Sequence, residues 1–261
     1  MLQALRTRPQ LCGLLTVLAI LLAWEIGVRS GLLNDKLISP ASTTLLRFAW
    51  EWTKPDFYAD FVVTTFRIAT GFFLAVAVAI PLGLAMGYWT LLHRMFFLTV
   101  EVIRPIPTTA LLPIAAIMVG IGNTMYVSLV FLATAIPILL ASVDGVRTVD
   151  PILIGSAKTL GKSTAEIFRT VLLPAAFPHI AVGLRIGVAT ALLVGISAEM
   201  LLSSEGLGHR VVYAQRTFDI SGIYAGVLTL ATLGFALNKI AMYFEARALR
   251  WHTQSKQKLW S

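Results

Sequence analysis

Long apolar stretches recur along this chain and constrain its fold more than any other feature. A helix needs roughly 20 apolar residues to cross the hydrocarbon core of a bilayer. Stretches of this kind cover residues 11–28, 62–88, 96–119, 126–143, 180–202 and 223–243. Backbone in hydrocarbon must satisfy its own hydrogen bonds, and these stretches do not alternate as the strands of a barrel would. The sequence therefore predicts an all-α membrane protein with six transmembrane helices, built as a single transmembrane domain over residues 1–261.

Composition supports this prediction. Hydrophobic residues make up 57% of the chain and charged residues 13%, whereas a soluble domain has about a quarter of its residues charged. The first stretch follows Arg6 and Arg8, as in a signal peptide, but it contains Trp24 and Glu25 and lacks a small-residue cleavage site. We therefore expect it to be kept as a membrane helix. Cys12 is the only cysteine, so no internal disulfide is expected.

The formal net charge is +8, and the distribution of basic residues indicates what this charge serves. If the N-terminus is cytoplasmic, the cytoplasmic side carries Arg6, Arg8, Arg94, Arg147, Lys158, Lys162, Arg169, Arg247, Arg250, Lys256 and Lys258. The other side carries the smaller set Arg29, Lys36, Arg47, Lys54, Arg210 and Arg216. This asymmetry follows the positive-inside rule and predicts a multi-pass protein of a bacterial inner (cytoplasmic) membrane with both termini cytoplasmic. Topology accounts for the excess of base, so membrane lipid is an expected partner and nucleic acid is not.

The segment ISPASTTLLRFAWEWTKPDFYADF, residues 38–61, follows the first span. Its Ser-Pro start and its amphipathic, aromatic-rich body favour a helix that lies along the outer membrane interface. We expect Trp50, Trp52, Phe57 and Tyr58 to lie at headgroup depth, as an interfacial anchor.

Residues 144–178 form the predicted cytoplasmic loop between the fourth and fifth spans, and they carry clear helix signals. Asp150, followed by a proline, is a typical helix start. Gly161 can end that helix in the left-handed conformation. Ser163 opens a second helix, and Glu166 three residues later completes a capping box. The sequence therefore predicts two short helices joined by a glycine elbow.

The same loop contains Gly-Lys-Ser-Thr, which resembles the end of a phosphate-binding loop. That motif requires four residues between its two glycines, whereas five separate Gly155 from Gly161. It must also follow a buried strand, and no sheet is predicted in this chain. We therefore interpret Lys162 and Ser163 as a turn residue and a helix cap, and we expect no cofactor bound to this chain.

The stretch GSAKTLGKSTAEIFRTVLLPAAFPHIAVGLR, which begins at residue 155, resembles the cytoplasmic loop of ABC-importer permeases. That family has the pattern Glu-Ala-Ala-x-x-x-Gly, followed further on by apolar-x-Leu-Pro. The matching residues are Ala157, Gly161, Val171, Leu173 and Pro174. Gly155 and Ser156 stand where Glu and Ala are usual, so a carboxylate that helps to grip the ATPase in the family is missing here.

Two further segments are similar to the permease subgroup that imports sulfonates, taurine, nitrate, bicarbonate and pyrimidine precursors. They are RPIPTTALLPIAAIMVGIG, residues 104–122, and SAEMLLSSEGLGHRVVYA, residues 197–214. The resemblance implies a homodimeric permease subunit of an ATP-driven importer, with a pathway for a small anionic solute. It also implies two separate ABC ATPase subunits, which bind ATP and Mg, and a periplasmic or lipid-anchored substrate-binding protein.

The resemblance further implies that the elbow couples the chain to the ATPases, as the coupling helix of the family does. The residues assigned to this ATPase-coupling loop are Gly155, Ser156, Ala157, Gly161, Lys162, Ser163, Glu166 and Pro174.

Several residues within the spans are predicted to line the substrate pathway. They are Arg104, Pro105, Pro107, Thr108, Thr109 and Glu199. The prolines interrupt the third span, and broken helices occur at membrane depth where they line a cavity. Arg104 either pairs with Glu101 on the same helix face or faces the pathway and attracts an anion. The threonine hydroxyls serve the pathway or bond back to their own helix. Glu199 requires a partner or water, and it either gates or shapes the pathway or makes a structural hydrogen bond.

Other residues in the spans have structural interpretations. Arg67 and Arg185, close to span ends, are expected to snorkel or to pair, with a role in the pathway as the alternative. Gly183, Gly187 and Gly195 are spaced for close contact between helices.

No catalytic or metal-binding constellation is apparent in the sequence. The histidines His93, His179, His209 and His252 are scattered over different loops and ends, without metal-ligand spacing. The spans contain no Ser/His or paired-Asp arrangement for hydrolysis. We therefore expect a non-catalytic membrane subunit. The alternative is a secondary transporter driven by an ion gradient, for which inverted repeats are typical.

Overall fold

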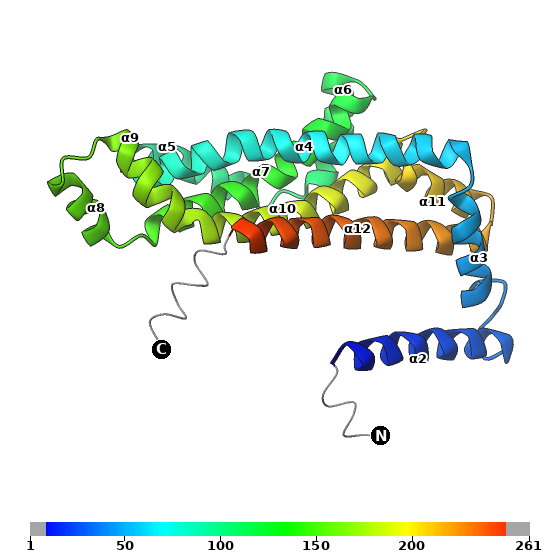
Figure 1. Ribbon diagram of the computed structural model, residues 1–261. Helices are drawn as coiled ribbons and strands as arrows, with labels where there is room; N and C mark the ends of the chain where they lie inside the picture. The colour runs from blue at the N-terminus through cyan, green and yellow to red at the C-terminus, as the bar shows by residue number, and fades with distance from the viewer. Residues whose placement is uncertain (1–8, 249–261) are drawn as a thin grey trace.

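Long helices lie side by side and form the body of the molecule (Figure 1). The computed structural model describes residues 9–248, in which there are helices and connecting segments but no strand. The helices are α2 (Pro9–Arg29), α3 (Ala41–Glu51), α4 (Pro55–Tyr88), α5 (Thr90–Ile103), the 3₁₀ turn η1 (Thr108–Leu111), α6 (Leu112–Val119), α7 (Asn123–Arg147), α8 (Pro151–Thr159), α9 (Thr164–Ile167), the π-helical turn η2 (Phe168–Leu172), α10 (Leu173–Leu202), α11 (Leu207–Arg216) and α12 (Ile220–Ala248). The prediction of an all-α fold is confirmed for the described residues.

The central helix α7 packs closely against α4 on one side and α10 on the other. Glycines allow this approach. A Cβ atom at Gly83 of α4 would lie 2.6 Å from the Cβ of Ser142 on α7, and one at Gly183 of α10 would lie 2.5 Å from the Cβ of Ala141. Such distances leave no room for a side chain, so the two interfaces depend on small residues. The predicted packing role of the glycines in the fifth span is confirmed, as Gly187 and Gly195 also meet side chains of neighbouring helices.

Four helices in the described part are long and apolar enough to cross a membrane: Pro55–Tyr88, Asn123–Arg147, Thr164–Leu202 and Ile220–Arg247. A fifth crossing is possible if α5 and the segment Thr108–Val119 count as one span, bent by 84°. The bend lies at Pro105 and Pro107, where the sequence predicts an interruption. The expected first span coincides with α2, but the count of six spans stays a prediction. Both termini, with Arg6, Arg8, Lys256 and Lys258, lie outside the described residues.

The two ends of the bundle differ (Figure 1). The short helices α8 and α9 lie at one end, which we call the elbow end, and α3 and α11 lie at the other, which we call the loop end. Helix α2 lies at the edge of the molecule and is joined to the rest mainly through α3, and its Trp24 ring contacts Tyr224 of α12 at a centroid distance of 5.7 Å.

The predicted outer interface helix is shorter than expected, because it ends at Glu51 and α4 already begins at Pro55. The expectation that Phe57 anchors the chain by contact with lipid headgroups is wrong, whereas its depth in the membrane stays a prediction. Its side chain is buried within the chain, and its ring centroid lies 4.8 Å from that of Trp52. Trp50 and Tyr58 remain about half exposed.

The elbow has the predicted local structure. The Asp150 carboxylate accepts a hydrogen bond from the Ile152 amide at 2.8 Å and caps α8. Gly161 has φ of 73°, in the left-handed region that glycine favours. Ser163 and Glu166 form the reciprocal capping box at the start of α9. Because each helix end is satisfied locally, the two short helices meet at a defined angle.

Candidate functional site

A groove with a volume of about 610 Å³ runs between α5, η1, α7 and α10. On α7 it extends from Leu132 to Asp144, and on α10 from His179 to Thr190. The α7 chain runs toward the elbow end and α10 runs away from it, so both ranges place the groove between the middle of the bundle and the elbow end. Its walls are mostly aliphatic, and we call it the central groove.

Arg104 brings positive charge to the central groove, at the break between α5 and η1. Its Nη1 atom lies 3.7 Å from Oε1 of Glu101, so the predicted ion pair on one helix face is confirmed. The pair is loose, and the Arg104 side chain remains 61% exposed. An arginine held in this way can meet an anion without first losing a tightly bound partner. Thr108 lines the same groove.

The other predicted pathway residues of this region adjoin the central groove without lining it. Pro105 and Pro107 form the connection between α5 and η1, and Thr109 follows Thr108 on η1. Ala110 donates its amide hydrogen to the Pro107 carbonyl at 2.8 Å, which closes the tight turn. The two prolines therefore fix the path of the short segment that carries Arg104 at one end and Thr108 at the other.

A layer of buried apolar side chains lies beyond the groove toward the loop end. On α7 it occupies the turns that precede the groove residues, except for Ala133, which lines the groove as well, and on α10 it occupies the turns that follow them. We call this layer the apolar plug, and its members are Leu112, Met125, Tyr126, Leu129, Ala133, Val194 and Ala198. The plug separates the central groove from the loop end of the bundle.

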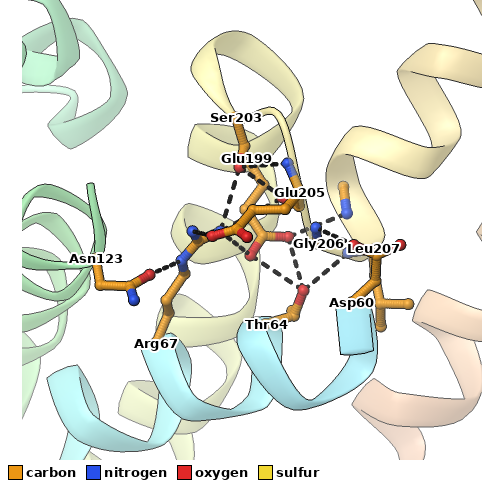
Figure 2. A network of polar contacts seen from close by, with 10 residues as sticks. Asp60, Thr64, Arg67, Asn123, Glu199, Ser203, Glu205, Gly206 and Leu207 are labelled. Carbon is orange, nitrogen blue, oxygen red and sulfur yellow. Dashed lines mark hydrogen bonds and ion pairs between the residues drawn. The ribbon is translucent and has the colours of Figure 1, made fainter. Parts of the chain in front are cut away.

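Arg67 on α4 is the hub of a buried polar network next to the plug (Figure 2). Its Nε donates to Asn123 Oδ1 at 2.7 Å, its Nη1 to Glu199 Oε1 at 3.0 Å and its Nη2 to Glu205 Oε1 at 2.6 Å. The guanidinium carbon lies 4.2 Å from the centroid of the Tyr126 ring, so the network rests on the plug. The Arg67 side chain is 3% exposed. We call this set the Arg67 network: Thr64, Arg67, Asn123, Glu199, Ser203 and Glu205.

Glu199 is the fixed acid of the Arg67 network. Its side chain is 1% exposed, and it accepts hydrogen bonds from Thr64 Oγ1 and from the Gly208 amide at 3.1 Å, besides the bond from Arg67. Both carboxylate oxygens therefore have hydrogen-bond donors, as a buried carboxylate requires. Glu199 does not line the central groove. The geometry therefore matches the structural interpretation of this residue and places it at the closed end of the bundle.

The connection from α10 to α11 is held by the same region (Figure 2). The Leu207 amide donates to Thr64 Oγ1 at 2.8 Å, and the Gly206 amide donates to Asp60 Oδ1 at 2.6 Å. These bonds satisfy amides at the N-terminus of α11, where negative charge is favourable. Residues 203–208 are therefore tied to α4 at several points.

A second set of ion pairs at the loop end fastens α3 to the bundle. Arg210 pairs with Asp60 and Glu51, and Arg47 pairs with Asp219 at 2.9 Å. Burial raises the pKa of the Glu51 carboxyl, but hydrogen bonds from Lys54 and Arg210 outweigh it and hold that pKa below its ordinary value. The balance is similar at Asp219, where bonds from Gly222 and Ser221 lower the pKa against the effect of burial. We call this set the α3 clamp: Arg47, Glu51, Lys54, Asp60, Arg210 and Asp219.

The sequence indicates only part of these interactions. The expectation that Arg67 and Arg185 pair is confirmed, since Arg185 binds Glu245 of α12. The role of Glu205 was not foreseen, because the residue lies outside the spans and 138 positions from Arg67. The available signal was Arg67 itself, an arginine within an apolar span, which requires a partner in the fold.

At the elbow end, the predicted coupling residues divide into a buried and an exposed group. Ala157 is buried, in a cluster with Ile167 and Leu172. Lys162 Nζ donates to Thr170 Oγ1 at 3.1 Å, within the elbow itself. The exposed predicted residues are Gly155, Ser156, Gly161, Ser163 and Glu166, and Pro174 is half-buried at the start of α10.

The outer face of α8 is apolar and lacks cover within the described residues. Ile152, Leu153 and Leu160 expose 72%, 53% and 78% of their surface. Exposed aliphatic side chains beside a capped, rigid turn are typical of a surface that another protein covers.

These features together define a membrane transport subunit: apolar helices, a groove closed toward one end, and a rigid elbow with an apolar face at the other. Residues 61–250 match the family described as the binding-protein-dependent transport system inner membrane component. The chain belongs to this family and is a permease component of an ABC importer.

Individual relatives agree with the family assignment. The chain is 33% identical over 196 residues to a probable ABC transporter permease protein of Brucella abortus, a match covering 75% of this chain and 78% of the relative. It is 33% identical over 186 residues to the taurine transport system permease protein of Escherichia coli, covering 71% of this chain and 68% of that one. A chain from an inward-facing crystal structure of the MetNI methionine ABC transporter superposes with a TM-score of 0.63, at 19% identity, covering 80% of this chain and 98% of the other. At that identity the superposition supports the fold.

Proposed function

We propose that this chain forms half of the solute pathway of an ATP-driven importer, and that it works as a homodimer with two ABC ATPase subunits and a soluble binding protein. ATP and Mg are bound by the ATPases and not by this chain. The elbow end faces the cytoplasm, as the distribution of basic residues predicts. The loop end faces the binding protein.

The single observation that carries the proposal is the position of the central groove between a closed end and the elbow. An alternating-access carrier needs a pathway that is closed on one side while it communicates with the other. Here the plug and the Arg67 network lie between the groove and the loop end, whereas Asp144 and His179 line the groove toward the elbow. We infer an inward-facing arrangement of this pathway.

Arg104 and Thr108 are the residues that we assign to solute passage. The positive charge of Arg104 favours a small anion, and two copies of the chain would double that charge. The taurine permease relative supports an organic sulfonate as the solute, with nitrate or bicarbonate as alternatives of the same charge. Pro105, Pro107 and Thr109 shape this part of the pathway, and Glu199 shapes its closed end.

The elbow is the coupling element in this proposal. The ATPases would cover the apolar face formed by Ile152, Leu153 and Leu160. Their closure on ATP would move the elbow, and the continuous helix Thr164–Leu202 would carry that movement to the plug and to the Arg67 network. Rigid-body motion of this kind changes access without unfolding any element.

Reconstitution tests the proposal. The permease is purified with its ATPase, placed in proteoliposomes with the binding protein, and supplied with labelled taurine, another sulfonate or nitrate. We expect a stable complex with the ATPase and uptake that requires ATP. Uptake by the permease alone on a proton or sodium gradient would instead establish a secondary transporter and overturn the proposal.

A further inference from the structure

The Arg67 network contains two carboxylates that differ in how firmly they are held, and the difference suggests how the closed end opens. Glu199 is 1% exposed, and besides the bond from Arg67 it accepts hydrogen bonds from the Thr64 hydroxyl and from the Gly208 amide. Glu205 lies on the connection between α10 and α11, and its side chain is 51% exposed. Both acids bind the same guanidinium.

This arrangement makes one of the two ion pairs easy to release. If Arg67 loses Glu205, its charge is still compensated by Glu199 at 3.0 Å. Glu205 in turn moves into water, because half of its surface already faces solvent. Removal of Glu199 would be different, since it would leave a buried arginine with only a partly exposed partner, and uncompensated buried charge is costly.

The tie between Arg67 and Glu205 also spans the elements that would have to separate. Arg67 lies on α4, and its Nε holds Asn123, the first residue of α7, directly after the broken third span. Glu205 belongs to the connection that leads into α11. The guanidinium rests on Tyr126 of the plug. Release of the Glu205 carboxylate therefore removes the shortest of the bonds between Arg67 and the connection 203–206. The Ser203 hydroxyl and the Glu205 carbonyl still accept from Arg67 Nη1, and the Gly206 amide still binds Asp60, so the connection loosens without detaching from α4.

We propose that the Arg67–Glu205 ion pair is the releasable tie of the closed end, and that Arg67 and Glu205 are positioning residues that set how often the plug becomes accessible from the loop end. The inference rests on the proposed function, because it assumes that the plug must open toward the loop end during transport. Engagement of the exposed Glu205 carboxylate by a basic side chain of the binding protein would release Arg67 without stranding its charge.

Thiol accessibility tests this tie. Cys12, the only cysteine in the sequence, is replaced by serine, and Val194→Cys introduces a thiol of similar volume into the plug, where Val194 is 7% exposed. The full complex in right-side-out membrane vesicles is treated with a membrane-impermeant maleimide, and the labelling rate is compared between variants. We expect Glu205→Gln to raise the rate about tenfold, the factor implied by loss of one charge-assisted hydrogen bond. Glu205→Asp should lie between Gln and the parent.

Asp219→Asn is the matched control, because Asp219 is a partly exposed acid of the same end that pairs with Arg47 and does not touch Arg67. Its labelling rate should stay at the parent value. A second readout is ATP hydrolysis by the full complex without binding protein, which should rise in Glu205→Gln and not in Asp219→Asn. A residue with a purely structural role would lower the amount of folded complex and would not raise ATP hydrolysis.

The outcomes separate the two proposals. The inference about the tie would be overturned if Glu205→Gln and the parent were labelled at the same rate. It would also be overturned if Glu205→Gln and Asp219→Asn were both labelled faster by the same factor. If the parent complex lacks ATP-dependent uptake, the proposed function fails, whatever the labelling rates are. If uptake is normal and labelling does not respond to Glu205→Gln, only the inference about the tie fails.

Discussion

The carboxylate of Glu199 occupies the space that a side chain at Gly206 would need. A Cβ atom at residue 206 would lie 2.6 Å from the carboxylate carbon and oxygens of Glu199, and the backbone at Gly206 has φ of 99°. The acid and the glycine are seven positions apart in the chain and fit together only in this conformation. This contact and the positive φ explain why residue 206, the first glycine of Glu-Gly-Leu-Gly, is a glycine.

The first prediction follows from this contact. Gly206→Ala should destabilise the protein by about 1–3 kcal/mol, since alanine is strained at a positive φ and its methyl group would displace the Glu199 carboxylate. Thermal unfolding of the purified complex, followed by size-exclusion chromatography, measures the effect. Gly155→Ala is the control, because a Cβ at Gly155 meets nothing within 4 Å. That variant should be neutral or gain about 0.5–1 kcal/mol within helix α8. Equal stability of both variants would show that the contact with Glu199 is unimportant.

Comparison of the sequence with the structure indicates which features are local. The caps at Asp150 and Ser163 and the left-handed turn at Gly161 were predictable, because each depends on residues within one or two turns. The bend after Arg104 was predictable from prolines. The start of α4 was not predictable from hydrophobicity, because the charged residues Asp56 and Asp60 interrupt the apolar pattern in its first turns.

The site was less predictable than the fold for a physical reason. Arg67 and Glu205 meet only after α4 has packed against α7 at Gly71 and α10 has packed against α4 at Gly195. No local sequence pattern therefore predicts their contact. Sequence reasoning correctly inferred that a membrane arginine needs a partner. The sequence indicated that Arg67 needs a partner but not which residue supplies it. It also placed Glu199 among the pathway residues, whereas in the fold Glu199 binds Arg67 and does not line the central groove.

The second prediction concerns the elbow. Gly161 has φ of 73° and open space around it, so a substitution acts through backbone strain alone. Gly161→Asn should retain coupling, because asparagine tolerates the left-handed conformation. Gly161→Val should lose it, because β-branched residues are outliers there. The measurement is the ratio of solute taken up to ATP hydrolysed in proteoliposomes. If the valine variant keeps the parent ratio, the geometry of the elbow is not what transmits the movement.

The third prediction concerns pH and the α3 clamp. The folded pKa of Glu51 is depressed, so its contribution to stability is complete above its unfolded value of 4.5 and is lost as the pH falls from there through the lower folded value. Glu51→Gln should cost about 1–3 kcal/mol at pH 7, the range for hydrogen bonds to charged groups. It should also flatten the decline of the unfolding midpoint between pH 6 and pH 3.

The tryptophans of α3 supply the readout for this clamp. Trp50 and Trp52 lie on or directly after the helix that Glu51 holds, so their fluorescence follows its release. Lys36→Gln is a suitable control, as this residue lies on the connection before α3 and outside the clamp. A parallel acid transition in the parent and in Glu51→Gln would exclude Glu51 as the titrating group.

The last prediction tests the charge of the central groove. Arg104→Gln should lower uptake of an anionic solute about tenfold at limiting concentration, because one unit charge at the groove wall stabilises a passing anion by about 1–2 kcal/mol even when water keeps the two roughly 10 Å apart, at an effective dielectric constant near 20. Arg104→Lys should keep most of the uptake, since it keeps the charge.

Glu101→Gln should raise uptake of the anion, because the carboxylate 3.7 Å from Arg104 offsets part of the positive field of that arginine. Arg216→Gln removes an exposed charge from α11 at the far end of the bundle and should have no effect. Opposite signs for the arginine and glutamate variants, with ATP hydrolysis unchanged in both, are what an electrostatic role requires, and equal losses in both would point to a role in packing alone.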